Sequence, residues 1–311
     1  MASDEAPLGT AFQHEALLYA GESAFIDVVL PFVQAGLDSD EAILVVISPP
    51  KIDALKSALS RRAASVEFQD MGRVGANPAL IIPAWRRFVD HHGNTRMRGV
   101  GEPISAARSG AELVECQLHE ALLNVAFAGV SGFRLACPYD TESLSPDVLE
   151  EAARSHPYLT QQGVTEASSG FASEVAGFRS PLPAPPAGAE AVIFGAGDHR
   201  AVRRWLASRL SEHGMTPARS EEMVLAVHEA AVNSMMHGAG NGWVRLWREE
   251  KKVVCDVEDL GWIDDPLIGR KEPDVMTPQG RGLWLANHLC DLVQIRSLYS
   301  GTVVRLHKGL T

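Results

Sequence analysis

Apolar residues recur along this chain in two patterns. Short continuous apolar runs, of which Ala42 to Ser48 (AILVVIS) is the clearest, predict strands buried on both faces. Longer stretches with apolar residues three and four positions apart predict amphipathic helices. Up to residue 155 the predicted strands are 15–19, 42–48, 66–70, 97–100 and 133–137, and the predicted helices between and after them are 22–35, 51–60, 77–91, 111–127 and 146–155. Strands separated by helices predict a parallel α/β sheet with helices on both faces.

A second series of elements follows a change in composition. Residues 180–189 read SPLPAPPAGA, a proline-rich stretch typical of a semi-rigid linker. Beyond it we predict a strand at 190–194, helices at 199–212 and 222–238, and two hairpins built from 243–248 with 252–258 and from 292–298 with 302–307. The expected organisation is a first domain over residues 1–160, a linker over 161–189 and a second domain over 190–311.

Composition limits the classes of function. A formal net charge of −11 over 311 residues argues against an extended nucleic-acid-binding surface, so no direct nucleic-acid partner is expected. No run approaches the roughly 18 apolar residues that cross a membrane, and the acidic start MASDEAPLGTAFQHE lacks the features of a signal peptide. We expect a cytoplasmic protein. Its four cysteines are scattered without a C-x-x-C pair, which favours buried reduced thiols over a zinc site or redox switch.

The predicted helix 222–238 (EMVLAVHEAAVNSMMHG) carries the first candidate chemistry. Glu229 and Asn233 are four residues apart, so their side chains project from the same side of the helix. A carboxamide oxygen can ligate Mg²⁺, and a carboxylate one turn away can orient or deprotonate an attacking hydroxyl. The simpler interpretation is a solvated glutamate and a helix-ending asparagine.

Three later stretches make the simpler interpretation less attractive. Asp259-Leu-Gly261 follows a predicted strand, where a carboxylate can accept a hydrogen bond from an exocyclic amine such as that of adenine. Gly280-Arg281-Gly282-Leu283 opens an apolar helix, and paired glycines at a helix start let backbone N–H groups approach phosphate. Gly301-Thr302 begins the last strand and places a hydroxyl near the same end of the sheet.

Taken in order, these motifs resemble the ATP-binding boxes of the histidine-kinase/gyrase-type (Bergerat) ATPase fold. Over about residues 191–308 the sequence looks most like the anti-sigma-factor serine kinases of the RsbW type. The resemblance implies a two-layer α/β sandwich whose mixed sheet is covered by helices on one face. It also implies ATP and Mg²⁺ as cofactors, with Mg²⁺ on Asn233, Glu229 as catalytic base and Asp259 reading the adenine amine. The remaining residues that it implies for ATP binding are Gly261, Gly280, Arg281, Gly282, Leu283 and Thr302.

The same resemblance implies a function and its partners. An RsbW-like domain would sequester a sigma factor and phosphorylate a serine or threonine of an anti-anti-sigma (STAS) protein. A second interpretation is a degenerate nucleotide-dependent module that sequesters a partner without phosphoryl transfer, because Trp262-Ile263 stand where the family often has a further glycine. A sensor histidine kinase is disfavoured: the region before the second domain is proline-rich, and His156 lies in SHPY, a poor helix context for a phosphoacceptor. Whether the chain forms a homodimer is left open.

The residues between Gly261 and Gly280 form the longest predicted loop. The stretch Trp262 to Gln279 is polar and punctuated by proline, and its position is where the family places an ATP lid. Arg270, Lys271 and Arg281 are its candidates for neutralising phosphate charge, with solvated loop charges as the alternative.

The first domain resembles a different family. The segments HEALLY, PFVQAGL, GANPALIIPAWRRFVD, GVGEPI, LVECQLHEALLN and CPYD together look like the MEDS sensory domain, named after methanogens and the DcmR regulator. The resemblance spans about residues 12–157 and implies a RecA/KaiC-like sheet and an unidentified small organic ligand. SPPK stands where a phosphate-binding loop would follow the strand AILVVIS, and proline donates no N–H, so a second nucleotide site is not expected.

Ligands of open parallel sheets bind beyond the carboxyl ends of the strands, which selects the candidate residues of this sensor. Glu115 and His119 also have metal-ligand spacing on one helix face, with an ordinary i,i+4 contact as the alternative. We hypothesise that His14, Glu102 and His119 line a small pocket. The full set of sensory-ligand candidates is His14, Glu102, Glu115, His119 and Tyr139.

Overall fold

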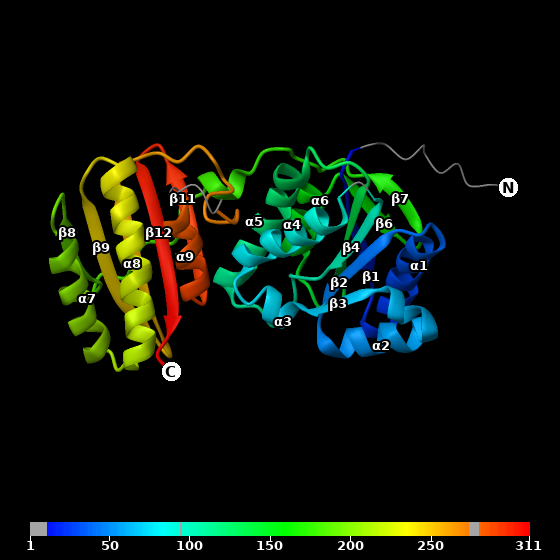
Figure 1. The fold of residues 1–311 in the computed structure, drawn as a ribbon, viewed down its shortest axis with the longest axis horizontal. Helices are drawn as coiled ribbons and strands as arrows, with labels where there is room; N and C mark the ends of the chain where they lie inside the picture. The colour runs from blue at the N-terminus through cyan, green and yellow to red at the C-terminus, as the bar shows by residue number, and fades with distance from the viewer. Residues whose placement is uncertain (1–10, 94, 274–279) are drawn as a thin grey trace. The chain divides into compact units, whose positions relative to one another are not determined.

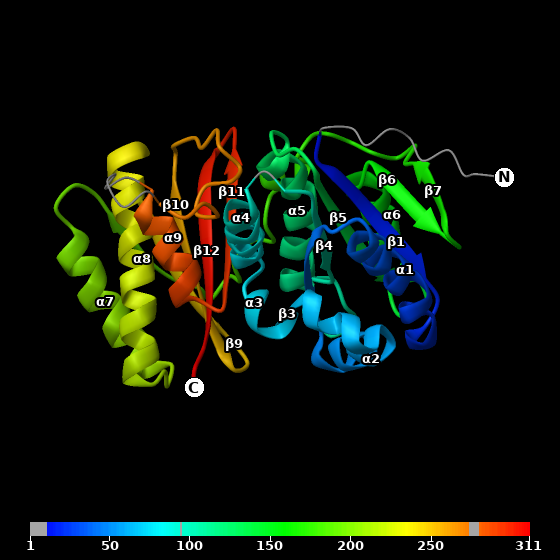
Figure 2. The same cartoon turned by 45° about the vertical axis from the view of Figure 1, so that its right-hand side comes forward.

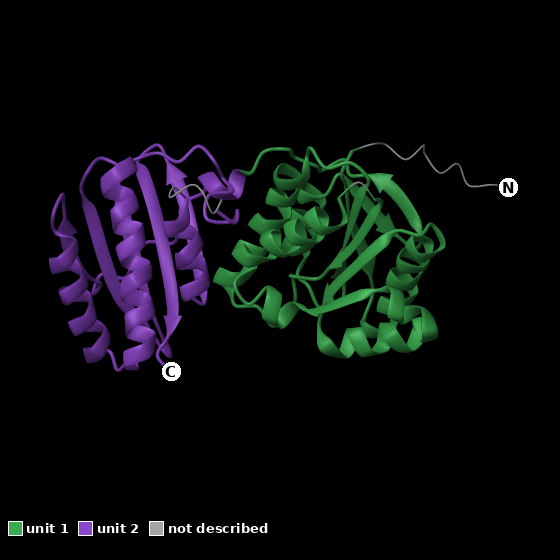
Figure 3. Cartoon of the chain, in the orientation of Figure 1, with its two compact units in different colours: residues 1–175 green, residues 176–311 purple. Residues whose placement is uncertain are grey.

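The computed structural model describes residues 11–93, 95–273 and 280–311. The chain divides into two compact units, Met1–Val175 and Ala176–Thr311 (Figure 3). Each unit has its own sheet and its own hydrophobic core.

The first unit is built on a seven-stranded sheet with the strand order β3-β2-β4-β5-β1-β6-β7. Strands β1 to β6 are parallel, and β7 closes an antiparallel hairpin with β6. The strands are β1 (Gln13–Tyr19), β2 (Ala42–Ile47), β3 (Glu67–Asp70), β4 (Met97–Gly101), β5 (Phe133–Asp140), β6 (Tyr158–Gln161) and β7 (Val164–Ala167). The parallel α/β class predicted from the alternating pattern is confirmed.

Two layers of helices cover this sheet. Helices α1 (Phe25–Asp38) and α2 (Pro49–Leu59) pack together on one face, and α4 (Ile81–His92), α5 (Gly110–Phe127) and α6 (Pro146–Ser155) form the other layer (Figures 1 and 2). Short turns and α3 (Met71–Val74) connect them. Side chains alternate between the two layers along each strand, as strand geometry requires. On β1, Leu17 and Tyr19 join the core under α1, whereas His14 contacts α5.

Local structure departs from the sequence predictions at two prolines and one polar run. Pro49 and Pro50 occupy the first turn of α2, where an N–H is unsatisfied in any case, so they begin that helix. Residues 158–167 form the β6–β7 hairpin, whereas the sequence placed the start of a linker at residue 161. The four residues of β7 are all exposed, which explains why this edge strand reads as a polar tether.

The second unit is a two-layer sandwich. Its sheet has the order β11-β12-β10-β9-β8, and every neighbouring pair is antiparallel, so the expected mixed sheet is wrong in this detail. The strands are β8 (Glu190–Phe194), β9 (Gly242–Glu249), β10 (Lys252–Asp259), β11 (Leu292–Leu298) and β12 (Gly301–Gly309). Helices α7 (His199–Glu212), α8 (Pro217–His237) and α9 (Arg281–Leu289) cover one face (Figure 1). The two-layer α/β fold is as predicted.

The opposite face of this sheet is polar and carries a salt bridge sealed from solvent. Arg305 on β12 donates two hydrogen bonds of 2.7 Å to the two carboxylate oxygens of Asp256 on β10. Arg305 also donates to the carbonyl of Pro183, so part of the proline-rich segment lies on this face. Arg179, in the short turn Ala176–Arg179, donates to the carbonyls of Ile263 and Ser297 at 2.9 and 3.0 Å. The chain from Arg179 to Pro183 is therefore anchored at two points to the second unit.

Within the described part of the chain, none of the helices combines the length and the apolar character needed to cross a lipid bilayer.

Candidate functional site

Helix α8 presents a carboxylate and a carboxamide one turn apart. Apolar residues at helical spacing, including Met223, Val227 and Ala230, bury one face of the helix against the sheet. Glu229 and Asn233 lie at the edge of that face and are half-buried. Neither side chain forms a hydrogen bond with another described residue, so their polar atoms remain available to a ligand.

The end of β10 is bound to the start of β12 by a small hydrogen-bonded turn. Asp259 Oδ1 accepts a hydrogen bond of 2.6 Å from the Gly261 N–H, and Thr302 Oγ1 donates to the Gly261 carbonyl at 2.9 Å. Thr302 also stands directly opposite Asp259 in the β10–β12 register. The turn therefore fixes the Asp259 carboxylate beside backbone that is nearly free of side chains.

Glycines allow α8, β10 and β12 to approach each other at this turn. A Cβ added at Gly261 would lie 2.6 Å from Asp259 Oδ1 and 2.6 Å from the Gly238 Cα at the end of α8. A Cβ at Gly301, whose φ is +131°, would lie 2.1 Å from the Asp259 carbonyl oxygen. Such distances exclude any side chain at these positions. The glycines are required by packing, whether or not a ligand binds.

The first turn of α9 completes the site from another side. Gly280 adopts φ +84°, the left-handed conformation, as the N-cap of this helix. Gly282 lies against α8: a Cβ there would be 3.0 Å from Glu229 Oε2. Arg281 is exposed, whereas Leu283 is buried in the core. The backbone at the start of α9 thus faces the carboxylate proposed as the catalytic base.

The loop expected to act as a lid is described only in part, since residues 274–279 lie outside the described residues. Its arginine and lysine differ in exposure: Arg270 is 6% exposed, whereas Lys271 is exposed and forms an ion pair of 2.9 Å with Asp265. At its start, Trp262 is 44% exposed and lies between the Tyr299 ring and the Arg179 guanidinium, which is 3.9 Å from the indole centroid. The turn that precedes the proline-rich segment therefore contacts the loop directly after Asp259-Leu-Gly261.

His228, which precedes the proposed base, has a perturbed environment. Burial lowers its pKa below the ordinary value, and the charges of Arg203 and His199 add to that effect, while Glu229 opposes it. The imidazole therefore tends to remain neutral beside Glu229.

These contacts place Gly282 of α9 against Glu229, and the Asp259 turn against Gly238 at the end of the same helix α8. The chemistry suits a nucleotide: unbonded oxygens on Asn233 and Glu229 for a cation and a hydroxyl, a fixed carboxylate at Asp259 for an amine, and glycine backbone for phosphates. A nucleotide with Mg²⁺ thus fits the residues present.

In the first unit the structure separates two of the sensory candidates. Glu102 accepts hydrogen bonds from Lys51 (2.5 Å) and the Tyr19 hydroxyl (2.8 Å) beneath α1 and α2. His14 lies five residues before Tyr19, about 16 Å along β1, and faces α5 on the other side of the sheet. One pocket cannot be lined by both, so the hypothesis that joined His14, Glu102 and His119 is corrected. Glu115 and His119 are buried on α5.

His14 instead belongs to a buried polar cluster that sequence reasoning missed. Its other members are Glu120 on α5, Cys137 on β5 and His156 directly after α6. Burial and the neighbouring His156 lower the pKa of His14 to about 4, and burial raises the pKa of the Cys137 thiol well above its usual range. The predicted residue Tyr139 lies at the border of this cluster, with its ring edge-on to His156 at 5.5 Å.

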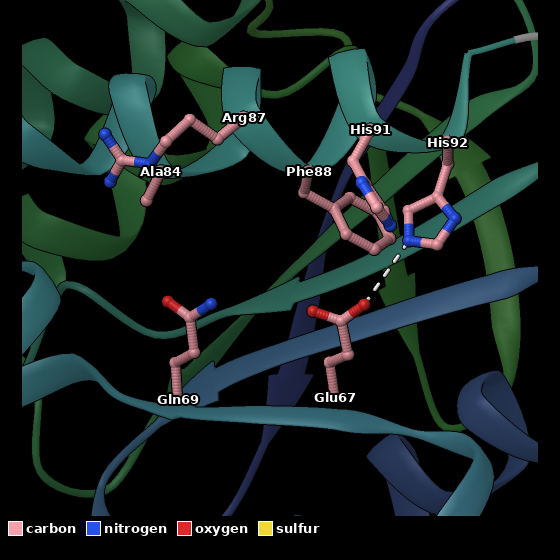
Figure 4. A pocket seen from close by; sticks show the side chains of 7 residues that line it. All are labelled: Glu67, Gln69, Ala84, Arg87, Phe88, His91 and His92. Atoms are coloured by element: carbon pink, nitrogen blue, oxygen red, sulfur yellow. Dashed lines mark hydrogen bonds and ion pairs between the residues drawn. The ribbon is translucent and has the colours of Figure 1, made fainter.

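A separate surface hollow lies between β3 and α4. It is lined by Glu67, Gln69, Ala84, Arg87, Phe88, His91 and His92 (Figure 4). His92 Nε2 lies 3.3 Å from Glu67 Oε1, but the rings of His91 and His92 are nearly perpendicular, at 88°. No group of three His, Cys, Asp or Glu side chains among the described residues of this hollow lies close enough together to hold a metal ion.

Each of the two units matches a known protein family. Residues 13–157 match the model of the MEDS family (MEthanogen/methylotroph, DcmR Sensory domain), and residues 196–308 match the histidine kinase-like ATPase domain. The chain therefore carries an N-terminal MEDS domain and a C-terminal histidine kinase-like ATPase domain, as the motifs predicted. No curated protein matches the chain.

One solved structure similar to part of the chain is the crystal structure of the RsbU and RsbW domains of a Mycobacterium tuberculosis protein. The match has 21% sequence identity and a TM-score of 0.29, and it covers 42% of this chain. It spans 34% of the other chain, about a third of its length.

Proposed function

We propose that this protein is a signal-transduction regulator in which the MEDS domain controls an ATP-binding anti-sigma domain. In this proposal the second domain sequesters a sigma factor and phosphorylates an anti-anti-sigma (STAS) protein on serine or threonine. The observation that supports it most is that helix α8 contacts both other motifs: Glu229 lies against Gly282 of α9, and Gly238 at the end of α8 lies against the Asp259 turn. A small organic ligand of the MEDS domain would set the state of the regulator, in the cytoplasm.

The residues have distinct roles in this proposal. Asn233 holds Mg²⁺, Asp259 accepts a hydrogen bond from the adenine amine, and the Gly280–Gly282 backbone binds phosphate. Arg281, exposed at the first position of α9, neutralises phosphate charge, and Thr302 holds the Asp259 turn through Gly261. ATP with Mg²⁺ supplies the phosphoryl group when bound. Glu229 takes the proton of the acceptor hydroxyl, because its carboxylate has no described hydrogen-bond donor and lies against Gly282.

A second candidate function is sequestration without phosphoryl transfer. Trp262 follows Asp259-Leu-Gly261 directly and is held between Arg179 and Tyr299. A bulky ring held at that position favours a docking surface beside the nucleotide. A nucleotide-dependent binding module would keep Asn233 and Asp259 in use and leave Glu229 without a catalytic role.

Calorimetry with ATP and Mg²⁺ tests the nucleotide site. We expect Mg²⁺-dependent binding by the full chain, weakened at least about tenfold, or 1.4 kcal/mol, in Asn233→Ala. Asn241→Ala is the matched control, because Asn241 is exposed in the loop before β9. Absence of binding by the folded wild type would contradict both candidate functions.

Glu229→Ala distinguishes the two candidates. If the domain is a kinase, this variant retains ATP and sigma-factor binding but loses phosphorylation of the STAS protein. Glu221→Ala, an exposed change on the same helix, serves as its control. A wild-type protein that binds ATP tightly and leaves every STAS protein unmodified would support the binding module.

A further inference from the structure

The buried cluster of the first unit gathers four metal-binding side chains. His14, Glu120, Cys137 and His156 are each 1% exposed or less, and one donor atom from each lies within 4.8 Å of all the others. The four come from β1, α5, β5 and the residue after α6. Four elements distant in sequence thus place their donors around one point inside the protein.

Hydrogen bonds around the cluster fix the orientation of both imidazoles. His14 Nδ1 lies 3.2 Å from Asn124 Oδ1, and the Asn124 amide is oriented by its own donation to the Ser155 carbonyl at 2.7 Å. His156 Nδ1 lies 2.8 Å from the Ala152 carbonyl. Because both partners are acceptors, each Nδ1 carries the proton, and each neutral ring then presents a lone pair at Nε2. Outer hydrogen bonds of this kind orient histidines in metal sites.

These lone pairs face a carboxylate. Glu120 Oε2 lies 3.1 Å from His14 Nε2 and 3.3 Å from His156 Nε2. Among the described residues no lysine or arginine pairs with Glu120, and its Oε1 and the His156 Nε2 have no hydrogen-bond partner. Acceptors cannot satisfy one another, and a buried charge without a counterion is costly. The Cys137 thiol can donate to Glu120, and the acceptors that remain are satisfied either by a proton on one imidazole or by a metal ion at the centre.

The spacing of the donors matches a tetrahedral ion. Bond lengths of about 2.0–2.1 Å to nitrogen or oxygen and 2.3 Å to sulfur separate neighbouring ligands of tetrahedral zinc by about 3.3–3.7 Å. Three of the six donor pairs are 3.1, 3.3 and 3.4 Å apart, close to this range, and all four donors lie within 4.8 Å of one another. Charge also balances, because one carboxylate, one thiolate and two neutral imidazoles neutralise a divalent cation.

We propose that His14, Glu120, Cys137 and His156 bind one divalent transition-metal ion, preferentially zinc. Nitrogen and sulfur donors select zinc and its neighbours over Mg²⁺ or Ca²⁺. Four protein ligands leave no coordination position for a substrate, so the site is of the closed, non-catalytic type. Its metal ion would stabilise the fold of the first unit or make that fold depend on metal concentration. Binding deprotonates the Cys137 thiol and releases that proton to solvent. This site is independent of the nucleotide chemistry proposed for the second unit.

Cobalt substitution tests the proposal on the untagged full chain, stripped of metal and kept reduced. We expect one Co²⁺ per chain, visible-region bands typical of tetrahedral cobalt, a thiolate-to-cobalt charge-transfer band, and displacement by one equivalent of Zn²⁺. Cys137→Ser should lose the charge-transfer band. Cys116→Ser is the matched control, because Cys116 is also buried in this unit but its thiol donates to the Pro103 carbonyl.

A second variant keeps the test decisive if Cys137→Ser fails to fold. Asn124→Ala retains all four ligands but removes the partner of His14 Nδ1, so we expect the same cobalt spectrum with affinity weaker by about tenfold or more. A wild-type chain that is folded by circular dichroism and binds no Co²⁺ or Zn²⁺ overturns the proposal. A charge-transfer band that persists in folded Cys137→Ser, or is lost in Cys116→Ser, overturns it equally.

Discussion

Asp256 in the second unit and Glu120 in the first are both carboxylates almost sealed from solvent, at 1% and 0% exposure. Asp256 has both oxygens bonded by Arg305, whose charge offsets the cost of burial. Glu120 faces two imidazoles and a thiol, and no arginine or lysine among the described residues reaches it. In the second unit an arginine of the chain itself neutralises the buried carboxylate. In the first unit the neutralising charge comes from the bound cation proposed above.

This difference separates two kinds of buried polar group. The charge of a carboxylate paired with arginine is neutralised as soon as the chain folds, without any bound ion. A carboxylate among neutral metal ligands is complete only with its ion, so the stability of that unit depends on metal concentration. The first arrangement fixes a structure, and the second can report a condition of the surroundings.

Arg305→Met tests the buried salt bridge between Asp256 and Arg305. Among the proposed variants, we expect it to have the largest effect on stability. It leaves Asp256 buried without a partner, so the free energy of unfolding of the second unit should fall by about 3–5 kcal/mol. Urea denaturation followed by tryptophan fluorescence measures it, since all tryptophans except Trp85 lie in the second unit. Lys271→Met, which breaks an exposed pair, should cost less than about 1 kcal/mol. Equal losses of unfolding free energy in Arg305→Met and Lys271→Met would contradict the view that the buried salt bridge stabilises the second unit more than the exposed one.

Arg179→Ala tests whether the turn before the proline-rich segment supports the nucleotide site. The change removes hydrogen bonds to the Ile263 and Ser297 carbonyls and the contact with Trp262. We expect about 1–2 kcal/mol lower stability of the second unit and several-fold weaker ATP binding in calorimetry, because the Asp259 turn adjoins this contact. Arg200→Ala, an exposed change on α7, should alter neither quantity. Unchanged ATP affinity in Arg179→Ala would contradict a role of this turn in nucleotide binding.

The smallest expected effect is a pH dependence from His228. Burial keeps its pKa below 6.5 in the folded protein, with Arg203 and His199 adding to the decrease and Glu229 opposing it. The folded state therefore binds fewer protons than the unfolded state, and His228 contributes stability above pH 6.5 that is lost as the pH falls below it. Thermal unfolding of the second unit at pH 7.5 and 5.5 should show a smaller decrease in His228→Gln than in the wild type. An identical decrease would exclude His228 as a source.

Much of the fold followed from the sequence because local patterns agreed with it. Continuous apolar runs and helical spacing were sufficient to predict the parallel sheet of the first unit. The β6–β7 hairpin was missed because an exposed edge strand such as Val164–Ala167 buries nothing and has no apolar pattern. The all-antiparallel pairing of the second sheet depends on strand order, which periodicity does not encode.

The two candidate sites differed in how far they could be predicted. The nucleotide motifs are short and local, so Glu229, Asn233 and Asp259 could be named from the sequence, and their roles remain predictions. Glu120, Cys137 and His156 had only weak signals: polar residues within or beside apolar runs. Their meeting point lies under α5 and not at the carboxyl ends of the strands, where the rule for open sheets directed attention.

The position of β1 in the sheet determines when the first unit can finish folding during synthesis. Of the described strands of this sheet β1 is the first to be made, yet it lies between β5 and β6, whose first residues are Phe133 and Tyr158. At a translation rate of about 5–20 residues per second, β1 waits on the order of ten seconds for its neighbours. Its apolar segment is exposed to chaperones during that interval. The four proposed metal ligands cannot come together before the last of them, His156, has been synthesised. A metal ion would therefore enter a nearly finished domain, and its arrival would mark the last step of maturation.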